Sequence, residues 1–328
     1  MSHVSSPELV ALGEVLIDFT QAGFSPNGQA LFERNAGGAP ANVAVQAARL
    51  GMSAQFVGKV GADMHGDFLR RSLQERGVGV SSVVQDPETF TTLAFVEVDP
   101  RTAERSFSFA RKPGADTRLS PAEVPEQAIR DCRVLHVGSL SLTDEPARAA
   151  MLHAVSIARQ AGALISYDPN YRASLWPSES EAIEQMTTLL HQADLVKINE
   201  DEALLLCGTS NPEAAAQCIL DQGATLVAVT LGSQGALVAT QTERVLVPTR
   251  PCQARDTTGA GDSFWGALLF QLVHEQGMRT ASDLAALSRE TLLCAESFAC
   301  AAASCCVERP GGIPAMPSKD EVLDRLTQ

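Results

Sequence analysis

The chain has 328 residues, 45% of them hydrophobic and 20% charged, and carries a formal net charge of −14. This length and composition suit one large α/β domain with a substantial core. The acidic balance argues against a nucleic-acid-binding protein, which needs a basic face. No apolar run is long enough for a transmembrane helix, and segment 1–8 lacks the apolar centre of a signal peptide. We therefore expect a cytoplasmic protein that binds neither nucleic acid nor membranes.

The eight cysteines form no CxxC pair, and five of them lie in the last quarter of the chain among small and apolar residues. The six histidines are scattered. These patterns predict buried thiols in a reducing compartment rather than disulfides or a metal cluster.

The predicted elements alternate between strand and helix along most of the chain. The apolar run 9–19 predicts a buried strand. A helix is expected over 39–50, because Pro40 suits a first helical turn and Gly51 suits a helix end. Further helices are expected over 68–76, 147–160 and 181–192, and further strands over 134–137, 163–168, 195–198 and 226–230. This alternation predicts a parallel sheet covered by helices on both faces.

Two segments, 29–35 and 91–110, depart from this pattern and resemble exposed strands with little helix between them. Phe107 and Phe109 alternate with serines, which is the period of a strand with two different faces. We expect these segments to form a small separate sheet. Its apolar face would need cover from a ligand or from a second subunit.

Segment 256–262 (DTTGAGD) is the most informative motif, because its small residues lead into apolar residues at helical spacing. The N–H groups at a helix start point outward and carry partial positive charge, which suits a phosphate. Asp262 at the same helix end is favoured in its ionised form and could act as the base in a phosphoryl transfer. The alternative is a plain glycine loop in which Asp262 only caps the helix.

Gly37 and Gly38 precede the helix over 39–50, and paired glycines allow a backbone to approach a ligand closely. Asn42, near the start of that helix, could bind hydroxyl groups through both amide atoms. Asp18, at the end of the first predicted strand, is a second candidate for hydroxyl binding, since ligands gather at the carboxyl ends of parallel strands. A structural glycine turn explains the two glycines equally well.

Polar residues also follow three later strands. Arg172, in segment 166–172 (SYDPNYR), could pair with a transferring phosphate. The acidic run 199–202 (NEDE) could hold magnesium through water, although a solvated helix start has the same composition. Segment 230–236 (TLGSQGA) could border a nucleotide through its glycines, or could be an ordinary hairpin turn.

Motifs of several other enzyme classes are missing from the sequence. No GxxxxGK[ST] segment is present, which excludes a P-loop kinase, and neither HExxH nor GxSxG occurs. A dehydrogenase with a Rossmann fold is the alternative from another enzyme class. It would need GxGxxG after the first strand, and no such loop follows segment 9–19.

Taken together, these residues resemble the ribokinase-like, or PfkB, carbohydrate kinase family from about Val10 to Pro317. Segment 37–42 (GGAPAN) is similar to the family's first signature, and segment 256–264 is similar to its more specific second signature. The resemblance implies a three-layer α/β/α sandwich with a mainly parallel sheet and a small β-sheet lid. It also implies ATP as phosphoryl donor, accompanied by Mg²⁺.

The resemblance further assigns roles to single residues. It implies that Asp262 is the general base, with Arg172 and an anion hole beside it, formed by the N–H groups of Gly259, Ala260 and Gly261. The sugar would contact Asp18, Gly37, Gly38, Asn42, Arg111 and Asn170. The nucleotide side would consist of Asn199, Glu202, Thr230, Gly232, Gly235 and Cys300, with Glu202 acting on magnesium through water.

Within the family, the likeness is greatest to fructokinases, and it rests on segments 112–116, 162–172 and 175–177. It implies D-fructose as acceptor and fructose 6-phosphate as product. Ketodeoxygluconate kinases and aminoimidazole riboside kinases share most of these motifs and remain alternatives. Cys300 stands where fructokinases usually have Asn, which leaves the base preference of the nucleotide open.

The family resemblance also implies a potassium ion behind the anion hole, near Asp256, Thr258, Gly311 and Gly312. Backbone carbonyl and carboxylate oxygens of such loops are the ligands that a hard cation prefers. The alternative is that Asp256 only fixes the turn by accepting hydrogen bonds from nearby N–H groups.

The predicted domain spans 1–328, with lid strands around 19–36 and 91–111 inserted in the α/β core. The lid strands carry the apolar side chains Leu93, Phe95, Phe107 and Phe109. Thin β-segments cannot bury two apolar faces alone, so we expect a homodimer joined through the lid.

Overall fold

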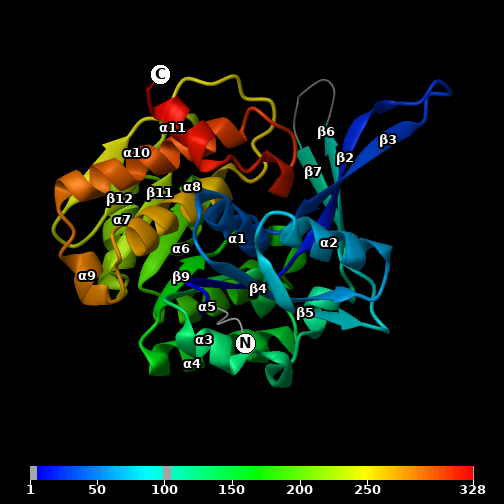
Figure 1. The fold of residues 1–328 in the computed structure, drawn as a ribbon, viewed down its shortest axis with the longest axis horizontal. Helices are drawn as coiled ribbons and strands as arrows, with labels where there is room; N and C mark the ends of the chain where they lie inside the picture. The colour runs from blue at the N-terminus through cyan, green and yellow to red at the C-terminus, as the bar shows by residue number, and fades with distance from the viewer. Residues whose placement is uncertain (1–5, 99–104, 328) are drawn as a thin grey trace, which may run out of the picture.

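The computed structural model describes residues 6–98 and 105–327 and contains two separate β-sheets (Figure 1). The larger sheet has nine strands in the order β13-β12-β11-β10-β9-β8-β1-β4-β5. Neighbours from β11 to β5 pair in parallel, and β12 and β13 pair antiparallel. The strands are β1 (Leu9–Leu12), β4 (Ala54–Gly61), β5 (Gly79–Asp86), β8 (Val134–Gly138), β9 (Leu164–Asp168), β10 (Leu195–Asn199), β11 (Leu226–Thr230), β12 (Ala236–Ala239) and β13 (Arg244–Val247).

Helices cover both faces of this sheet, as the alternation predicted. One apolar core joins the sheet to α4, α5 and α7, and a second core on the opposite face joins it to α1, α8 and α10. The predicted α/β/α sandwich is therefore confirmed. The helices are α1 (Ala39–Leu50), α2 (Met64–Gln74), α3 (Glu126–Asp131), α4 (Ala147–Ala161), α5 (Glu179–Leu190), α6 (Glu200–Cys207), α7 (Pro212–Asp221), α8 (Ala260–Leu269), α9 (Ala281–Ala285), α10 (Arg289–Cys306) and α11 (Lys319–Thr327). Within the described residues, none has the length and apolarity that a membrane crossing requires.

The central strands are apolar because both of their faces are buried. In β8, Val134 packs into one core while Leu135 and Val137 pack into the other. Each such fully buried side chain contributes roughly 1.5–3 kcal/mol relative to exposure. This double burial holds the strand ends, and the polar residues that follow them, in fixed positions.

The apolar run 9–19 is not one strand, as predicted, but parts of two. β1 belongs to the nine-stranded sheet, whereas β2 (Leu16–Phe24) belongs to the smaller sheet. Between them, Gly13 lies against the ring of Pro40, where a Cβ on residue 13 would be 2.6 Å from Cγ of the proline. The chain leaves the large sheet at this point, and the next residue, Glu14, reaches the cavity described below.

Helix boundaries follow from capping. α1 has the predicted bounds and ends at Gly51, whose φ of 114° is a conformation that favours glycine. α2 begins at Met64, before the predicted start at residue 68. Asp63 causes this earlier start, because its side chain accepts hydrogen bonds from the N–H groups of His65 and Gly66.

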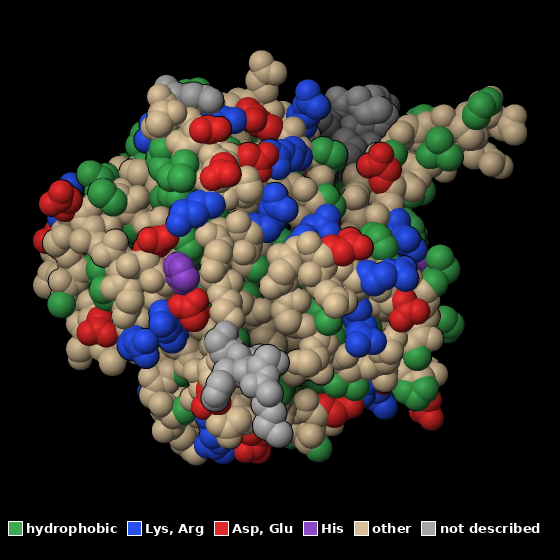
Figure 2. All heavy atoms as spheres, viewed as in Figure 1, with side chains coloured by type: hydrophobic (Ala, Val, Ile, Leu, Met, Phe, Trp, Pro, Cys, Tyr) green, Lys and Arg blue, Asp and Glu red, His purple; other side chains and the backbone are tan. Residues whose placement is uncertain are grey.

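The smaller sheet, which we call the lid, consists of β2, β3 (Ala30–Gly37), β6 (Leu93–Val98) and β7 (Arg105–Ala110) in the order β3-β2-β6-β7. A separate sheet was predicted here, and it is confirmed. Figures 1 and 2 show the arm formed by β2 and β3 extending away from the main body. Phe19 stacks on Phe95 at 5.3 Å between ring centroids, and Phe32 meets Phe95 edge-on at 6.2 Å. The side chain of Phe107 lies outside the described residues.

Candidate active site

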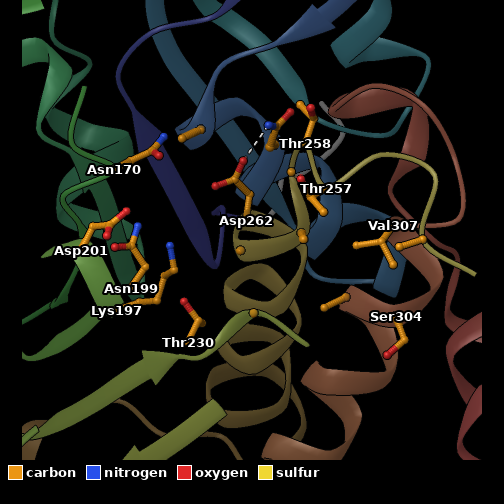
Figure 3. Close-up of a pocket in the computed structure, with 18 of the residues that line it drawn as sticks. Asn170, Lys197, Asn199, Asp201, Thr230, Thr257, Thr258, Asp262, Ser304 and Val307 are labelled. Carbon is orange, nitrogen blue, oxygen red and sulfur yellow. Dashed lines mark hydrogen bonds between the residues drawn. The ribbon is translucent and has the colours of Figure 1, made fainter. Parts of the chain in front are cut away.

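A cavity of about 930 Å³ lies between the large sheet, the start of α8 and the base of the lid (Figure 3). Asn199 and Thr230, the last residues of β10 and β11, line it together with Lys197. The lid contributes Asp18 from β2 and Phe109 from β7. Ligands gather at this edge of open α/β sheets, because the loops that follow parallel strands converge there.

The motif over 256–262 forms a loop and a helix start, as predicted. Gly259 is the N-cap of α8 and has a φ of 78°, which favours glycine. The cavity is lined by Gly259, Ala260 and Gly261. The first N–H groups of a helix have no partner within the helix, so this end of the cavity offers donors and partial positive charge to an anion.

Asp262, in the first turn of α8, lines the same cavity and is 8% exposed. Its Oδ2 accepts a hydrogen bond of 2.7 Å from Nδ2 of Asn42 on α1, drawn in Figure 3. Burial raises the pKa of Asp262 to about 6, and the charge of Asp168 acts in the same direction, while Lys197, Asn42 and Arg172 oppose the rise. Such a carboxylate is mostly ionised at neutral pH yet accepts a proton readily, as a general base must.

A buried ion pair beside α8 was not predicted. Nζ of Lys197 lies 2.8 Å from Oδ2 of Asp168, and the two side chains are 6% and 1% exposed. Although burial alone would lower the pKa of Lys197, the neighbouring Asp168 carboxylate raises it, so the lysine keeps its charge. Gly261 leaves room for the lysine, because a Cβ on residue 261 would lie 3.0 Å from Nζ. A lysine inside the apolar strand 195–198 was the available sequence signal, since buried lysines require a partner.

Glu14 is a second cavity residue that sequence reasoning missed. Its side chain lines the cavity and is only 2% exposed, and its Oε1 accepts a hydrogen bond of 3.1 Å from the N–H of Ala39 at the start of α1. Interpreting 9–19 as one strand concealed the residue. An acid interrupting an apolar run was the signal that could have revealed it.

The predicted sugar-binding residues Asp18, Gly38, Asn42 and Asn170 line the cavity, as does Arg172. Burial raises the pKa of Asp18 to about 7, and the positive charge of Arg172 opposes the rise.

Gly37 is not among the described residues that line the cavity. The position nevertheless requires a glycine. A Cβ on residue 37 would lie 2.0 Å from Oδ2 of Asp18, so this glycine provides the space that the carboxylate occupies. Gly37 therefore contributes to the site indirectly, by leaving space for Asp18, and not through the predicted contact with the sugar.

Arg111 was predicted to contact the sugar; it lies near Glu14 of the cavity, but its guanidinium is engaged by other groups of the protein. Its buried guanidinium pairs with Asp116 at 2.8 Å, and it donates to Oγ1 of Thr143 and to the carbonyl oxygen of Leu140. It is not among the described residues that line the cavity. Asp116 therefore pairs with the positive charge of Arg111 that was predicted to face a ligand.

Asn199, Thr230 and Gly232, predicted on the nucleotide side, line the cavity as well. The segment that contains Thr230 and Gly232 is also a hairpin connection, because β11 and β12 pair antiparallel across it. Gly235 does not line the cavity within the described residues. A Cβ on residue 235 would lie 2.0 Å from the carbonyl oxygen of Val247. The glycine therefore allows the backbone at residue 235 to pack closely against Val247.

Glu202 was predicted to act on magnesium through water, but its two carboxylate oxygens bind backbone. Oε2 accepts the N–H of Asn199 at 2.9 Å and Oε1 accepts the N–H of Tyr171 at 2.8 Å. The side chain is buried and is not part of the described cavity lining. Glu202 therefore fixes two loops of the site, and its neighbours Asn199, Glu200 and Asp201 line the cavity instead.

Cys300 was predicted to border the nucleotide base, and this placement is also corrected. The residue is 3% exposed, and its thiol points to the carbonyl oxygen of Val247 at 3.7 Å. The cavity is lined instead by Ala303 and Ser304, about one turn further along α10, and by Val307, which follows the helix. The cysteine therefore belongs to the packing between α10 and β13.

Asp256 connects the loop before α8 to a loop near the chain end. Its Oδ1 accepts the N–H of Thr258 at 2.8 Å and its Oδ2 accepts the N–H of Gly311 at 3.0 Å. These bonds fix the turn, as one of the two sequence interpretations expected. No group of three or more His, Cys, Asp or Glu side chains in the described part of the chain could hold a metal ion.

The cavity therefore combines three elements at the start of α8. The helix N–H groups and Lys197 can bind an anionic group, Asp262 can remove a proton from a hydroxyl, and the lid side carries further carboxylates that can accept hydroxyl hydrogen bonds. This set of groups suits transfer of a phosphoryl group from an anionic donor to a polyol.

Comparisons with known proteins agree with this chemistry. Residues 6–319 match the family described as pfkB family carbohydrate kinase. The chain is 41% identical over 321 residues to probable fructokinase-4 of Arabidopsis thaliana, covering 97% of this chain and 96% of that protein.

Two solved structures extend the comparison to three dimensions. The fructokinase with bound ATP from Xylella fastidiosa has a TM-score of 0.89 and 35% identity, covering 97% of this chain and 98% of that one. A fructokinase double mutant from Vibrio cholerae O395 in a fructose, ADP and potassium ion bound form has a TM-score of 0.85 and 30% identity, covering 98% and 99%. The chain belongs to the pfkB family of carbohydrate kinases.

Proposed function

We propose that this chain is an ATP-dependent fructokinase that converts D-fructose to fructose 6-phosphate, with Asp262 as general base. The observation that carries the proposal is the buried Asp262 carboxylate beside the first N–H groups of α8 and close to Lys197. Relatives named as fructokinases, and neighbours whose structures contain ATP or fructose with ADP, support the choice of substrates.

In the proposed reaction, Asp262 takes the proton of the sugar hydroxyl as the hydroxyl oxygen bonds to the γ-phosphorus of ATP. The bond from that phosphorus to the bridging oxygen breaks, and ADP leaves with its electron pair. The N–H groups of Gly259, Ala260 and Gly261, together with Lys197, balance the negative charge on the phosphoryl oxygens. Magnesium bound to ATP would neutralise further charge, and Asn199 and Asp201 line the cavity with oxygens that could reach it through water.

The charges around the cavity favour a neutral sugar over a sugar acid such as ketodeoxygluconate. Five carboxyl groups line it, from Glu14, Asp18, Glu200, Asp201 and Asp262. Arg111, which could otherwise bind a substrate carboxylate, is held by Asp116. An acid would therefore meet like charge in a partly desolvated space, which costs several kcal/mol of binding.

The test is a coupled assay of ADP formation with fructose, glucose, ribose, ketodeoxygluconate and aminoimidazole riboside as acceptors. We expect fructose to give the highest kcat/KM, and ³¹P NMR of the product to identify the 6-phosphate. If ketodeoxygluconate or a nucleoside exceeded fructose by tenfold or more, the proposed acceptor would be wrong.

We also propose that potassium raises the activity by ordering the loops joined by Asp256. The Vibrio cholerae relative with bound potassium supports this, and so does the position of Asp256, which joins the loop before α8 to Gly311. Initial rates in potassium and tetramethylammonium buffers of equal ionic strength, with Mg²⁺ and ATP fixed, test it. Equal rates in the two buffers would contradict the proposal and leave Asp256 as a loop-fixing residue.

A homodimer joined through the lid is a further proposal. The lid exposes Phe24 (66%), Leu31 (47%), Phe32 (37%) and Phe95 (37%), which is an apolar surface that a second copy could cover.

A cytoplasmic location is proposed as well. It is supported by the eight cysteines, which are all free thiols and therefore suit a reducing compartment.

A further inference from the structure

Glu14 has one carboxylate oxygen without a partner. Oε1 accepts the N–H of Ala39, but Oε2 is buried and has no hydrogen-bond partner among the described residues. An ionised carboxylate oxygen can only accept hydrogen bonds, and leaving one buried and unpaired is costly. The arrangement therefore calls for a donor that the described part of the chain does not itself supply.

The surroundings of Glu14 explain why no protein donor reaches Oε2. Leu16 and Leu140, which line the cavity with it, are apolar. The nearby Arg111 is occupied by Asp116, Thr143 and a backbone carbonyl. Burial raises the pKa of Glu14 to about 7; its own backbone N–H and the charge of Arg111 oppose the rise, whereas Asp116 adds to it.

The position of Glu14 relative to Asp262 defines what could supply the donor. Glu14 binds the N–H of Ala39 at the start of α1, and Asn42, almost one turn later on α1, binds Asp262. Ala39 and Asn42 are three positions apart, which corresponds to a rise of about 4.5 Å along α1, so the two contacts lie at successive levels of the same helix end. A sugar whose reacting hydroxyl is at Asp262 can therefore present a different hydroxyl to Glu14.

We propose that Oε2 of Glu14 accepts a hydrogen bond from a non-reacting hydroxyl of the sugar and that Glu14 is a specificity-determining residue of the acceptor site. The proposal rests on the proposed sugar-kinase function and adds a residue to its acceptor site. It explains why a buried acid is placed at the break between β1 and β2, where an apolar residue would otherwise pack.

The test uses Glu14→Gln, in which Oε1 can still accept the Ala39 N–H while an amide NH₂ replaces Oε2. Loss of a hydrogen bond to a charged group costs about 1.5–3 kcal/mol, so we expect kcat/KM for fructose to fall at least about tenfold, mainly through KM. The KM for ATP should change less than about twofold, because the nucleotide side is untouched.

Glu296→Gln is the matched control. Glu296 is buried and also has one oxygen on a backbone N–H, that of Val247 at 3.2 Å, and one oxygen without a partner. It is not among the described residues that line the cavity. Its glutamine variant should keep the wild-type KM for fructose, so a loss confined to Glu14→Gln reflects position and not the mere removal of a buried carboxyl.

Deoxyfructose analogues separate a direct contact from a structural effect. The analogue that lacks the hydroxyl bound by Oε2 should bind wild type weakly, and Glu14→Gln should not weaken its binding further. For each of the other analogues, Glu14→Gln should lower the affinity by the same factor as it does for fructose. Unchanged kinetics in the variant, or an equal loss with every analogue, would overturn the proposal.

Two further measurements keep the outcome unambiguous. If Glu14→Gln does not fold, deoxyfluoro sugars are tested on wild type, because fluorine cannot donate a hydrogen bond. The proposal then requires one non-reacting position at which the deoxy and the deoxyfluoro analogue both bind at least about tenfold more weakly than fructose. No such position would overturn it. If wild type does not use fructose at all, the proposed substrate fails separately, and the Glu14 test proceeds with deoxy analogues of the preferred acceptor.

Discussion

All five residues of β8 in the nine-stranded sheet are buried, whereas the arm of the lid exposes Phe24, Leu31 and Phe32. The large sheet is covered by helices on both faces, and its strand ends carry Asp168 and Lys197 into the cavity side of the molecule. The lid has apolar rings packed on one another at its base and little cover at its tip. The difference indicates that the candidate groups for phosphoryl transfer are held by a well-covered frame, while the lid, which contributes Asp18 and Phe109 to the cavity, leaves apolar side chains uncovered.

The first prediction concerns the well-covered frame. Asp262→Asn should fold normally and lose about 10²–10⁴-fold in kcat, because a general base typically contributes that much. The asparagine can still hydrogen-bond Asn42, so the KM for fructose and the thermal midpoint should change little. Steady-state kinetics and a melting curve test this. Near-wild-type turnover in a folded variant would remove Asp262 from the role of base.

The second prediction concerns the buried ion pair. Lys197→Met should lower kcat about 10–100-fold, since a charged hydrogen bond to the phosphoryl group is worth about 1.5–3 kcal/mol. It should also destabilise the protein by about 3–5 kcal/mol, because Asp168 loses its counter-charge in a buried site.

The control for Lys197 combines it with a second change. Lys197→Met with Asp168→Asn should regain most of the thermal stability, because no buried charge is left unpaired, and should remain slow. If the double variant regained activity along with stability, the ion pair would only support the fold. Binding of a non-hydrolysable ATP analogue relative to ADP provides a second readout, since only the analogue carries the γ-phosphoryl group.

The third prediction is a pH dependence. Asp262 must be ionised to accept a proton, and burial raises its pKa to about 6, so kcat for fructose should halve near pH 6 and fall about tenfold for each pH unit below that. The decline of kcat/KM should begin nearer pH 7, because burial raises the pKa of Glu14 and Asp18 to about 7. Lys197 lowers the pKa of Asp262, so the acid limb of kcat should move to higher pH in Lys197→Met. An acid limb of kcat below pH 5 in wild type would contradict the buried environment of Asp262.

The fourth prediction concerns the lid and has the smallest effect on chemistry. Phe32→Asp should convert the proposed homodimer to monomers, because it places a charge on an exposed apolar surface. The kcat should stay within a few-fold of wild type, since the transfer groups lie at the start of α8 and on β10, outside the lid. Light scattering at micromolar concentration measures the state, with Leu293→Asp, an exposed leucine on α10, as the control. A wild type that is already monomeric would contradict the proposed dimer.

Most of the fold could be predicted from sequence, because strands buried on both faces and helices with one apolar face have distinct patterns. The bounds of α1 and β11 follow directly from those patterns. The prediction of one strand over 9–19 was wrong, because an apolar run does not indicate which of two sheets its residues join.

The candidate site was predictable where a motif places several residues on one loop, as in 256–262, and less so where contacts decide the role. Arg111, Glu202 and Cys300 occur at positions that suggest ligand contact, but each is engaged by groups inside the protein. Lys197 and Glu14 were missed for the converse reason, because single polar residues in apolar strands become informative only when their partners are known.

The hydrogen bond between Asn42 and Asp262 joins residues 220 positions apart in the chain. Asp256 similarly ties the loop before α8 to Gly311, near the end of the chain. Contacts of such sequence separation form late, because closing a long loop is entropically unfavourable until the intervening structure is in place. During synthesis, the base therefore meets its amide partner only after nearly the whole polypeptide has emerged. In a refolding experiment, recovery of catalysis should lag behind recovery of helical circular dichroism, which makes turnover a strict reporter of completed assembly.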